Sequence, residues 1–328
     1  MPALDDSLEN SGQSRVLIYG RPMTRKTWWA LRAAELGFNV LYFDFDSNFQ
    51  VAQNLSPEAR GRIYRVDCRM PTGLLMNNMA LTLLKISKGE RVLIDEETRR
   101  FTQKGQVVAE KNYLAVQLDK ASETDVVVID SWTAFTLCLA QHQRNMNDPE
   151  LVTKLEWDDY AKLRMAEDML LDNMRRLSSH LIVVGHAETN AKRKPDADPK
   201  GRPHEVIETV REQVASASRA HGEMIAGKFT DQLFFTIPAG TKAPNISTAG
   251  NADFDAGARR VPPARYMWDD LTIDRLMSPG VVAAAKNSIP SGAWQTVTGQ
   301  SVIDERGKAG SAVIDTPAKP TILNIGKK

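Results

Sequence analysis

The sequence predicts an α/β fold: a mainly parallel central sheet flanked by helices, with a hairpin insertion and a flexible C-terminal tail. Short runs rich in Val, Ile, Leu and Phe alternate along the chain with longer segments of helical periodicity. Several of these runs are apolar throughout, as expected of strands that helices cover on both faces. Polar residues of chemical interest directly follow the runs, and ligands of parallel sheets bind at the carboxyl ends of strands.

The hydrophobic pattern assigns most of the chain to individual elements. The predicted strands are 15–20, 39–46, 62–66, 125–130, 180–186, 232–237 and 265–268. The predicted helices are 26–36, 72–88, 112–121, 150–178 and 205–221. Residues 91–111 predict a hairpin that turns near Lys104 and Gly105. Residues 187–204 are polar, basic and contain prolines, so they predict a loop.

Composition limits the domain organisation and the class of partner. The chain has 328 residues, 42% of them hydrophobic and 25% charged, which is typical of a globular protein. We expect a disordered segment 1–14, one domain 15–278 and a mostly disordered tail 279–328, in which Thr321–Ile325 could dock on a partner protein. The net charge is +1, so any attraction to nucleic acid must be local.

Cysteine usage and hydropathy bear on the compartment. Cys68 and Cys138 lie in unrelated segments without metal-binding spacing, which indicates reduced thiols that pack in the interior. The first 14 residues contain no apolar signal core, and no apolar run approaches the ~18 residues of a membrane span. These features predict a cytoplasmic protein that does not enter a membrane.

The most informative segment is Gly20-Arg21-Pro22-Met23-Thr24-Arg25-Lys26-Thr27, between a predicted strand and a predicted helix. It matches the phosphate-binding pattern G-x-x-x-x-G-K-[ST], except that Arg25 replaces the second glycine. Backbone N–H groups at the start of a helix attract anions, Lys26 can neutralise phosphates, and the Thr27 hydroxyl can ligate Mg²⁺. The alternative is an ordinary strand-to-helix turn that contains Lys-Thr. Arg25 weakens the case for hydrolysis more than the case for binding.

A second candidate ligand for Mg²⁺ is Asp130, at the end of the apolar run Val126–Ile129. Such a strand delivers one carboxylate to the metal shell of a phosphoryl-transfer site. Asp95 is the competing residue, because Val92–Ile94 also runs into acidic residues. The longer apolar run favours Asp130.

Taken together, these motifs resemble the RecA-like P-loop NTPases, and most closely the phage-encoded nucleotide-binding and single-strand annealing proteins. The resemblance covers residues 15–275 and is carried by 20–27, 42–46, 128–131 and 183–186. It implies a RecA-like core, ATP and Mg²⁺ as cofactors, assembly into a homo-oligomer, and the cytoplasm of a bacterial host as location.

The resemblance also implies roles for individual residues. Asp46 stands where the family has the acidic residue that activates the attacking water, with Asp44 as the fallback. His186 stands at the position of the γ-phosphate sensor, and the segment after it contacts DNA in the family. Here that segment, 192–202, carries five cations and two acids, a net +3. The expected nucleic-acid contacts are Lys192, Arg193, Lys194, Lys200 and Arg202, and Arg265 is the expected residue that completes a neighbour's site.

Three functions are consistent with this pattern. The first is an ATPase that acts on single-stranded DNA in phage recombination, annealing or replication. The second is a nucleotide-gated binding or scaffold protein with little turnover, which Arg25 and the shorter Asp46 favour. The third is a small-molecule P-loop kinase with residues 187–202 as its lid. Stimulation of hydrolysis by single-stranded DNA separates the first function from the others.

Overall fold

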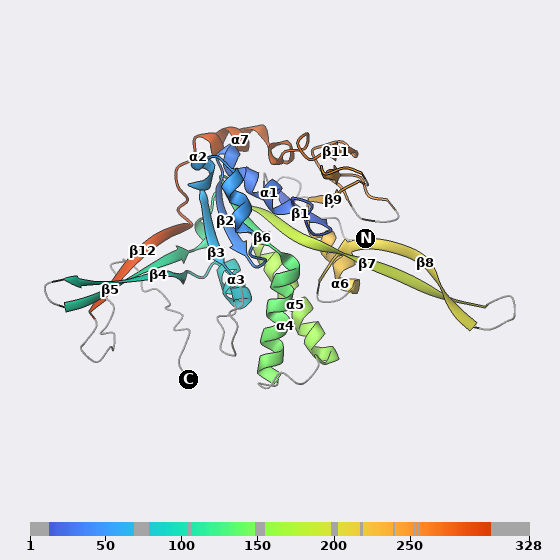
Figure 1. The fold of residues 1–328 in the computed structure, drawn as a ribbon, viewed down its shortest axis with the longest axis horizontal. Helices are drawn as coiled ribbons and strands as arrows, with labels where there is room; N and C mark the ends of the chain where they lie inside the picture. The colour runs from blue at the N-terminus through green and yellow to red at the C-terminus, as the bar shows by residue number, and fades with distance from the viewer. Residues whose placement is uncertain are drawn as a thin grey trace.

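The computed structural model describes residues 13–68, 79–103, 106–147, 155–197, 203–216, 219–238, 240–251, 254 and 256–302. Within this part of the chain, a nine-stranded sheet has the order β11-β10-β9-β1-β7-β6-β2-β3, and β8 pairs with β7 alone (Figure 1). Six strands run parallel: β1 (Arg15–Gly20), β2 (Asn39–Asp44), β3 (Ile63–Asp67), β6 (Asp125–Asp130), β7 (His180–Ala197) and β9 (Asp231–Thr236). The short β10 (Asn245–Ser247) and β11 (Arg265–Met267) are antiparallel at one edge. The expected α/β class, with a mainly parallel central sheet, is confirmed.

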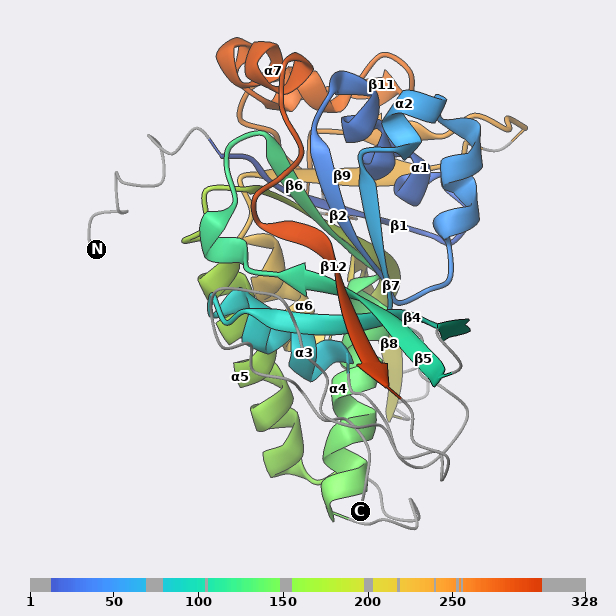
Figure 2. The same cartoon turned by 90° about the vertical axis from the view of Figure 1, so that its left-hand side faces the viewer.

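Helices cover both faces of this sheet. Strand alternation sends Leu17 and Tyr19 to one face and Val16 and Ile18 to the other. The second face packs against α1 (Lys26–Leu31), the 3₁₀ helix η1 (Arg32–Leu36), α2 (Pro57–Arg60) and α7 (Pro279–Lys286). The first face packs against α3 (Met79–Ser87), α4 (Trp132–Asn147), α5 (Trp157–Met174) and α6 (Arg219–Ala226) (Figure 2). Burial on both faces explains the uniformly apolar strand sequences.

Two β structures project from opposite sides of the central sheet (Figure 1). The three-stranded arm has the order β12-β5-β4 and consists of β4 (Val92–Gln103), β5 (Gln106–Val116) and β12 (Trp294–Val302). The two-stranded arm consists of β7 from Ala187 onward and β8 (Pro203–Val214). The same strand β7 therefore belongs to the central sheet up to His186 and to an arm beyond it.

The predicted loop 187–204 and helix 205–221 are wrong. β7 continues to Ala197, β8 occupies 203–214, and α6 begins only at Arg219. The ladder from Ala187–Val214 to Ala197–Pro203 satisfies the backbone polar groups of both strands. Backbone pairing can therefore hold a polar segment extended, which a periodicity argument does not detect.

The predicted hairpin is present but longer than 91–111, and the predicted helix 112–121 is wrong. β5 continues to Val116, and only the short 3₁₀ helix η3 (Leu118–Lys120) follows. β12 pairs with β5 over the whole of Trp294–Val302. Leu114 and Val116 are buried, so this part of β5 is held by packing as well as by pairing.

Residues 279–302 contain α7 and β12, although the sequence predicts a tail from 279. Ser278 caps α7 by accepting a hydrogen bond from Val281 N–H, and Val281 and Ala285 pack on the core. Trp294 at the start of β12 is only 1% exposed. A few well-placed apolar residues thus fold a segment whose average composition is that of a tail. Residues 303–328, with Thr321–Ile325, lie outside the described residues.

Helix α4 and strand β10 were not predicted, and the other expected elements are present. The helix expected at 26–36 is α1 followed by η1, and those expected at 72–88 and 150–178 are α3 and α5, each preceded by residues outside the described ranges. Ser14 already belongs to the fold, because its N–H donates to His180 Nδ1 at 2.9 Å. Cys68 and Cys138 are buried free thiols. Among the described residues, no helix has the length and apolarity needed to cross a bilayer.

Candidate functional site

The loop between β1 and α1 has unusual backbone φ angles, at a glycine and at two residues that are not glycine. Gly20 has φ 154°, and a Cβ there would lie 2.2 Å from the carbonyl oxygen of Phe235, so only glycine fits. Met23 and Arg25 have φ of 62° and 63°, in the left-handed region that non-glycine residues rarely adopt. Strained residues of this kind concentrate at binding sites, and left-handed residues in a loop are typical of backbone nests that bind anions.

Lys26 is held inside this loop. Its side-chain amine donates to Gly20 O at 3.0 Å, to Arg21 O at 2.7 Å and to Thr24 Oγ1 at 3.3 Å. Burial lowers the pKa of Lys26 to about 8, although the charges of Asp130 and Asp46 oppose this shift. A buried amine whose hydrogen-bond acceptors are neutral groups of the loop is well placed to exchange them for phosphate oxygens.

Asp130 lies beside this loop at the end of β6. Thr27 Oγ1 and the Tyr42 hydroxyl both donate to its Oδ2, the latter at 2.9 Å. Burial raises the pKa of Asp130 to about 6, and these two hydrogen bonds oppose the shift. The carboxylate at the end of β6 and the threonine hydroxyl at the start of α1 therefore form one hydrogen-bonded pair of oxygen groups that could hold a metal ion.

His186 and Asp46 form a second pair at the same sheet edge. His186 Nε2 lies 2.9 Å from Asp46 Oδ2, and the His186 N–H donates to Thr133 Oγ1 at 3.3 Å. Burial alone would raise the pKa of Asp46, but hydrogen bonds from His186 and Ser131 hold it below its usual range. Asp46 is thus an ionised carboxylate whose charge is largely satisfied by the histidine.

Asp44 has a different environment. It is fully buried, and its Oδ2 accepts from Arg65 Nη2 at 2.7 Å and from Arg65 Nε at 2.9 Å. Its Oδ1 accepts from the Asn48 N–H at 3.0 Å. These contacts stabilise the turn after β2, so the geometry favours Asp46 over Asp44 for a chemical role.

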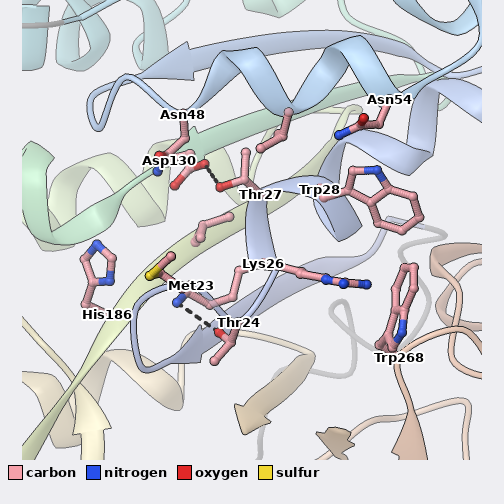
Figure 3. Close-up of a pocket in the computed structure, with 13 residues that line it drawn as sticks. Met23, Thr24, Lys26, Thr27, Trp28, Asn48, Asn54, Asp130, His186 and Trp268 are labelled. Carbon is pink, nitrogen blue, oxygen red and sulfur yellow. Dashed lines mark hydrogen bonds between the residues drawn. The ribbon is translucent and has the colours of Figure 1, made fainter. Parts of the chain in front are cut away.

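A cavity of about 500 Å³, within the range of small-molecule sites, lies at this edge of the sheet. One end is lined by Lys26, Thr27, Asp130 and His186. The other end is lined by Trp28, Trp268 and Asn54, and Figure 3 shows these side chains on the far side of Lys26 from His186. The cavity therefore has a charged end and an aromatic end.

The other predicted site residues lie elsewhere. Asp95 is in β4 of the three-stranded arm, a different sheet from that of Asp130. Lys192, Arg193 and Lys194 are in the part of β7 that belongs to the two-stranded arm, and Lys200 and Arg202 lie outside the described residues. Arg265 is exposed on β11 and lines a second cavity, of about 490 Å³, together with Arg21.

Sequence reasoning missed part of the site. Tyr42 on Asp130, Asn48 and Asn54 in the cavity wall, and the Trp28–Trp268 pair were not predicted. Trp28 directly follows the Lys-Thr pair and could have been noticed. Trp268 comes from the segment after β11, and no local pattern links that segment to the loop.

Comparisons with known proteins do not assign the chain to a family. No protein-family model and no curated protein matches it. Among solved structures, the RadB recombinase is similar with a TM-score of 0.40 and 15% identity, covering 80% of this chain and 90% of RadB. A type III secretion system ATPase of pathogenic bacteria is similar with a TM-score of 0.40 and 10% identity, covering 83% of this chain and 61% of the ATPase. At these scores neither neighbour decides the function, and the fold rests on the strand order given above.

Proposed function

We propose that the chain binds ATP with Mg²⁺ in this cavity and hydrolyses it as a RecA-like ATPase that acts on single-stranded DNA. The observation that carries the proposal is the convergence of Lys26, the Thr27–Asp130 pair and the His186–Asp46 pair from four strand ends. Phosphoryl transfer needs a cation on the phosphates, a metal site and a group that positions the nucleophile. This edge of the sheet supplies a residue for each.

The ligand set supports Mg²⁺. The Thr27 hydroxyl and the Asp130 carboxylate are hard oxygen ligands already in hydrogen-bond contact, and Mg²⁺ prefers such ligands together with phosphate oxygens. When bound, the ion would neutralise charge on the phosphates. Lys26 would give up its contacts with Gly20 O and Arg21 O to bind the same phosphates.

Asp46 is the proposed residue that orients the attacking water. Its lowered pKa makes it a weak base, because a strong general base needs a pKa near the working pH. In our proposal, turnover therefore requires His186 to move off Asp46. This step connects hydrolysis to β7, the strand that carries His186 into the two-stranded arm.

The same contact between His186 and Asp46 supports a second candidate function. A protein in which His186 stays on Asp46 would bind the nucleotide and turn it over slowly. Such a protein would act as a nucleotide-gated binding or scaffold protein.

The two-stranded arm is the proposed contact for single-stranded DNA. Its basic residues Lys192, Arg193 and Lys194 can attract backbone phosphates without sequence preference. Its root touches the phosphate-binding loop, because Arg21 Nη2 lies 3.1 Å from Glu212 Oε1 on β8. Nucleotide phosphates would compete with Glu212 for Arg21. Nucleotide binding in the loop would therefore weaken the ion pair that links the loop to the arm.

Oligomerisation completes the proposal. Arg265 lies on the exposed edge strand β11, from which it could reach the nucleotide of a neighbouring copy. We retain the homo-oligomer and the phage context as parts of this proposal, since both come from the resemblance in sequence.

The deciding experiment measures ATP hydrolysis with and without single-stranded DNA. We expect stimulation by DNA in the native chain and loss of both binding and hydrolysis in Lys26→Ala, since each charge-assisted hydrogen bond contributes about 1.5–3 kcal/mol. Unchanged ATP affinity in Lys26→Ala would remove the nucleotide site. ATP binding with slow hydrolysis that DNA does not change would favour the second candidate function.

The arm is tested by replacing Lys192, Arg193 and Lys194 with alanine. If all three contact phosphates, the slope of log affinity against log salt should flatten by about two units, and ATP affinity should not change. The matched control replaces the exposed Lys88, Lys120 and Lys286, which lie off the arm. An equal loss of DNA affinity in both triple variants would show only an effect of net charge.

A further inference from the structure

The aromatic end of the cavity contains a cluster of two tryptophan and two arginine side chains. The rings of Trp28 and Trp268 meet edge to face, with centroids 4.6 Å apart and an interplanar angle of 71°. The Arg25 guanidinium lies 5.0 Å from the centroid of Trp268, and that of Arg32 lies 4.8 Å from the centroid of Trp28. The cluster brings Trp28 of α1 and the two arginines that flank this helix together with the segment after β11.

Arg25 is the residue that replaces a glycine in the phosphate-binding pattern. Its guanidinium lies over the ring of Trp268. Figure 3 shows Trp268 at the opposite end of the cavity from His186. The left-handed backbone that a glycine would adopt freely is retained here with a long side chain. The departure from the pattern therefore concerns the aromatic end and leaves the Lys26 contacts with the loop in place.

We propose that the aromatic end is a nucleobase site that accepts a purine, stacked against the Trp268–Arg25 pair. This inference rests on the proposed function, because the charged end of the same cavity would hold the phosphates. Indole rings and planar guanidinium groups are surfaces on which bases stack, and the larger face of a purine gains more from them. The ribose would span the cavity between its two ends.

Asn54 supplies the polar contact at this end. Its side chain lies beside Trp28 on the cavity wall (Figure 3). A side-chain amide offers a donor and an acceptor together, which suits the donor and acceptor edge of adenine. Val51 adds an apolar contact on the same 3₁₀ helix, η2 (Phe49–Asn54).

The test compares ATP, CTP and inorganic tripolyphosphate, each with Mg²⁺, by titration calorimetry. We expect ATP to bind at least tenfold more tightly than CTP or tripolyphosphate. Trp268→Ala should weaken ATP binding by about 5- to 150-fold, the range for losing one stacked base, and leave tripolyphosphate affinity unchanged. Trp157→Ala is the control, because Trp157 is 80% exposed on α5.

Arg25→Gly is the second variant. It restores the motif glycine at a left-handed position, so it should fold at least as well as the native chain. It should weaken ATP binding and keep tripolyphosphate binding. If Trp268→Ala lowers the melting temperature, two single variants, Trp268→Phe and Arg25→Gly, decide. Trp268→Phe keeps an aromatic ring and should bind ATP nearly normally, whereas Arg25→Gly should bind it more weakly.

Each outcome separates the base site from the phosphate site. Equal affinities for ATP, CTP and tripolyphosphate, or an ATP affinity untouched by Trp268→Ala and Arg25→Gly, would overturn the base site and leave the phosphate site standing. Absence of binding by all three ligands would overturn the proposed function itself.

Discussion

The central sheet and the two arms are stabilised in different ways. Strands of the central sheet are buried on both faces, and their ends place Lys26, Thr27, Asp130 and His186 around one cavity. The arms extend away from this core and are built as antiparallel ladders, β7 with β8 and β4 with β5 and β12 (Figure 1). Burial on two faces selects apolar residues, whereas a ladder is satisfied by backbone groups whatever the side chains are.

Strand β7 joins the two kinds of structure. Gly185 pairs with Tyr19 in the central sheet, and Ala187 pairs with Val214 in the arm. His186 lies between them and contacts Asp46. A movement of the arm would therefore act on the proposed catalytic carboxylate through one residue.

The largest effect that we expect contrasts two neighbouring carboxylates of the central site. Asp46→Asn should slow ATP hydrolysis by about 10²–10⁴, the contribution of a positioned general base, and should leave ATP binding near normal. Asp44→Asn should mainly lower the melting temperature, because it weakens the ion pair between the buried Asp44 carboxylate and the half-buried Arg65. Equal loss of hydrolysis in the two variants, without loss of stability, would contradict the separate roles.

The next effect concerns the root of the three-stranded arm. Trp294→Ala should lower the free energy of unfolding by about 3–5 kcal/mol, the usual cost of removing a buried Trp side chain. Trp157→Ala, at an exposed position of α5, should change it by less than about 0.5 kcal/mol. Denaturant titration of both variants measures the difference, and a Trp294→Ala variant as stable as the native chain would mean that the arm is not anchored on the core.

This comparison also explains what the sequence could predict. Continuous apolar runs predict the strands that carry Val16–Tyr19 and Val126–Ile129. The position of Lys26, Thr27 and Asp130 just after these runs makes them recognisable as candidate site residues. The β4–β5 hairpin was predicted, although too short, whereas the two-stranded arm gives no such signal. Lys192–Lys194 is as polar as a loop and is held extended by its partner strand.

Sequence reasoning could predict only those site residues that lie within a recognisable sequence motif. Trp268 reaches the cavity only through the fold of the segment after β11, and the Tyr42 contact with Asp130 depends on how β2 and β6 align. Burial of Trp294 is likewise a tertiary effect within a segment rich in small residues. Long-range packing, which no local pattern contains, accounts for these omissions.

A third prediction tests whether the metal ligand is Asp130 in the central sheet or Asp95 in the three-stranded arm. Asp130→Asn should weaken Mg²⁺-dependent ATP binding by about 10- to 150-fold, since a charged ligand contributes about 1.5–3 kcal/mol. Asp95→Asn, in the three-stranded arm, should leave this binding unchanged. Titration of ATP with and without Mg²⁺ distinguishes the two, and a defect confined to Asp95→Asn would move the metal site to the arm.

The smallest effect, about tenfold, is the pH dependence of ATP binding. Phosphate binding needs the protonated amine of Lys26, whose pKa burial lowers to about 8. Above pH 8 the free site is increasingly uncharged, so ATP affinity should fall about tenfold between pH 7 and pH 9, following the protonated fraction. Metal binding needs ionised Asp130, whose pKa burial raises to about 6, so the Mg²⁺-dependent part of the affinity should fall below pH 6. The maximum should therefore lie between about pH 6 and pH 8.

Two variants assign the limbs of this pH profile. Lys26→Arg keeps its charge throughout the range, because the guanidinium does not lose its proton, so the loss above pH 8 should disappear even if overall affinity is lower. Asp130→Asn should remove the Mg²⁺-dependent change below pH 6, and a measurement without Mg²⁺ separates it from protonation of the nucleotide itself. Binding of DNA by the two-stranded arm, measured over the same range, should not follow this profile, because Lys26 and Asp130 belong to the cavity. A high-pH limb that persists in Lys26→Arg would show that a different group controls nucleotide binding, and would weaken the assignment of the phosphate site more than that of the arm.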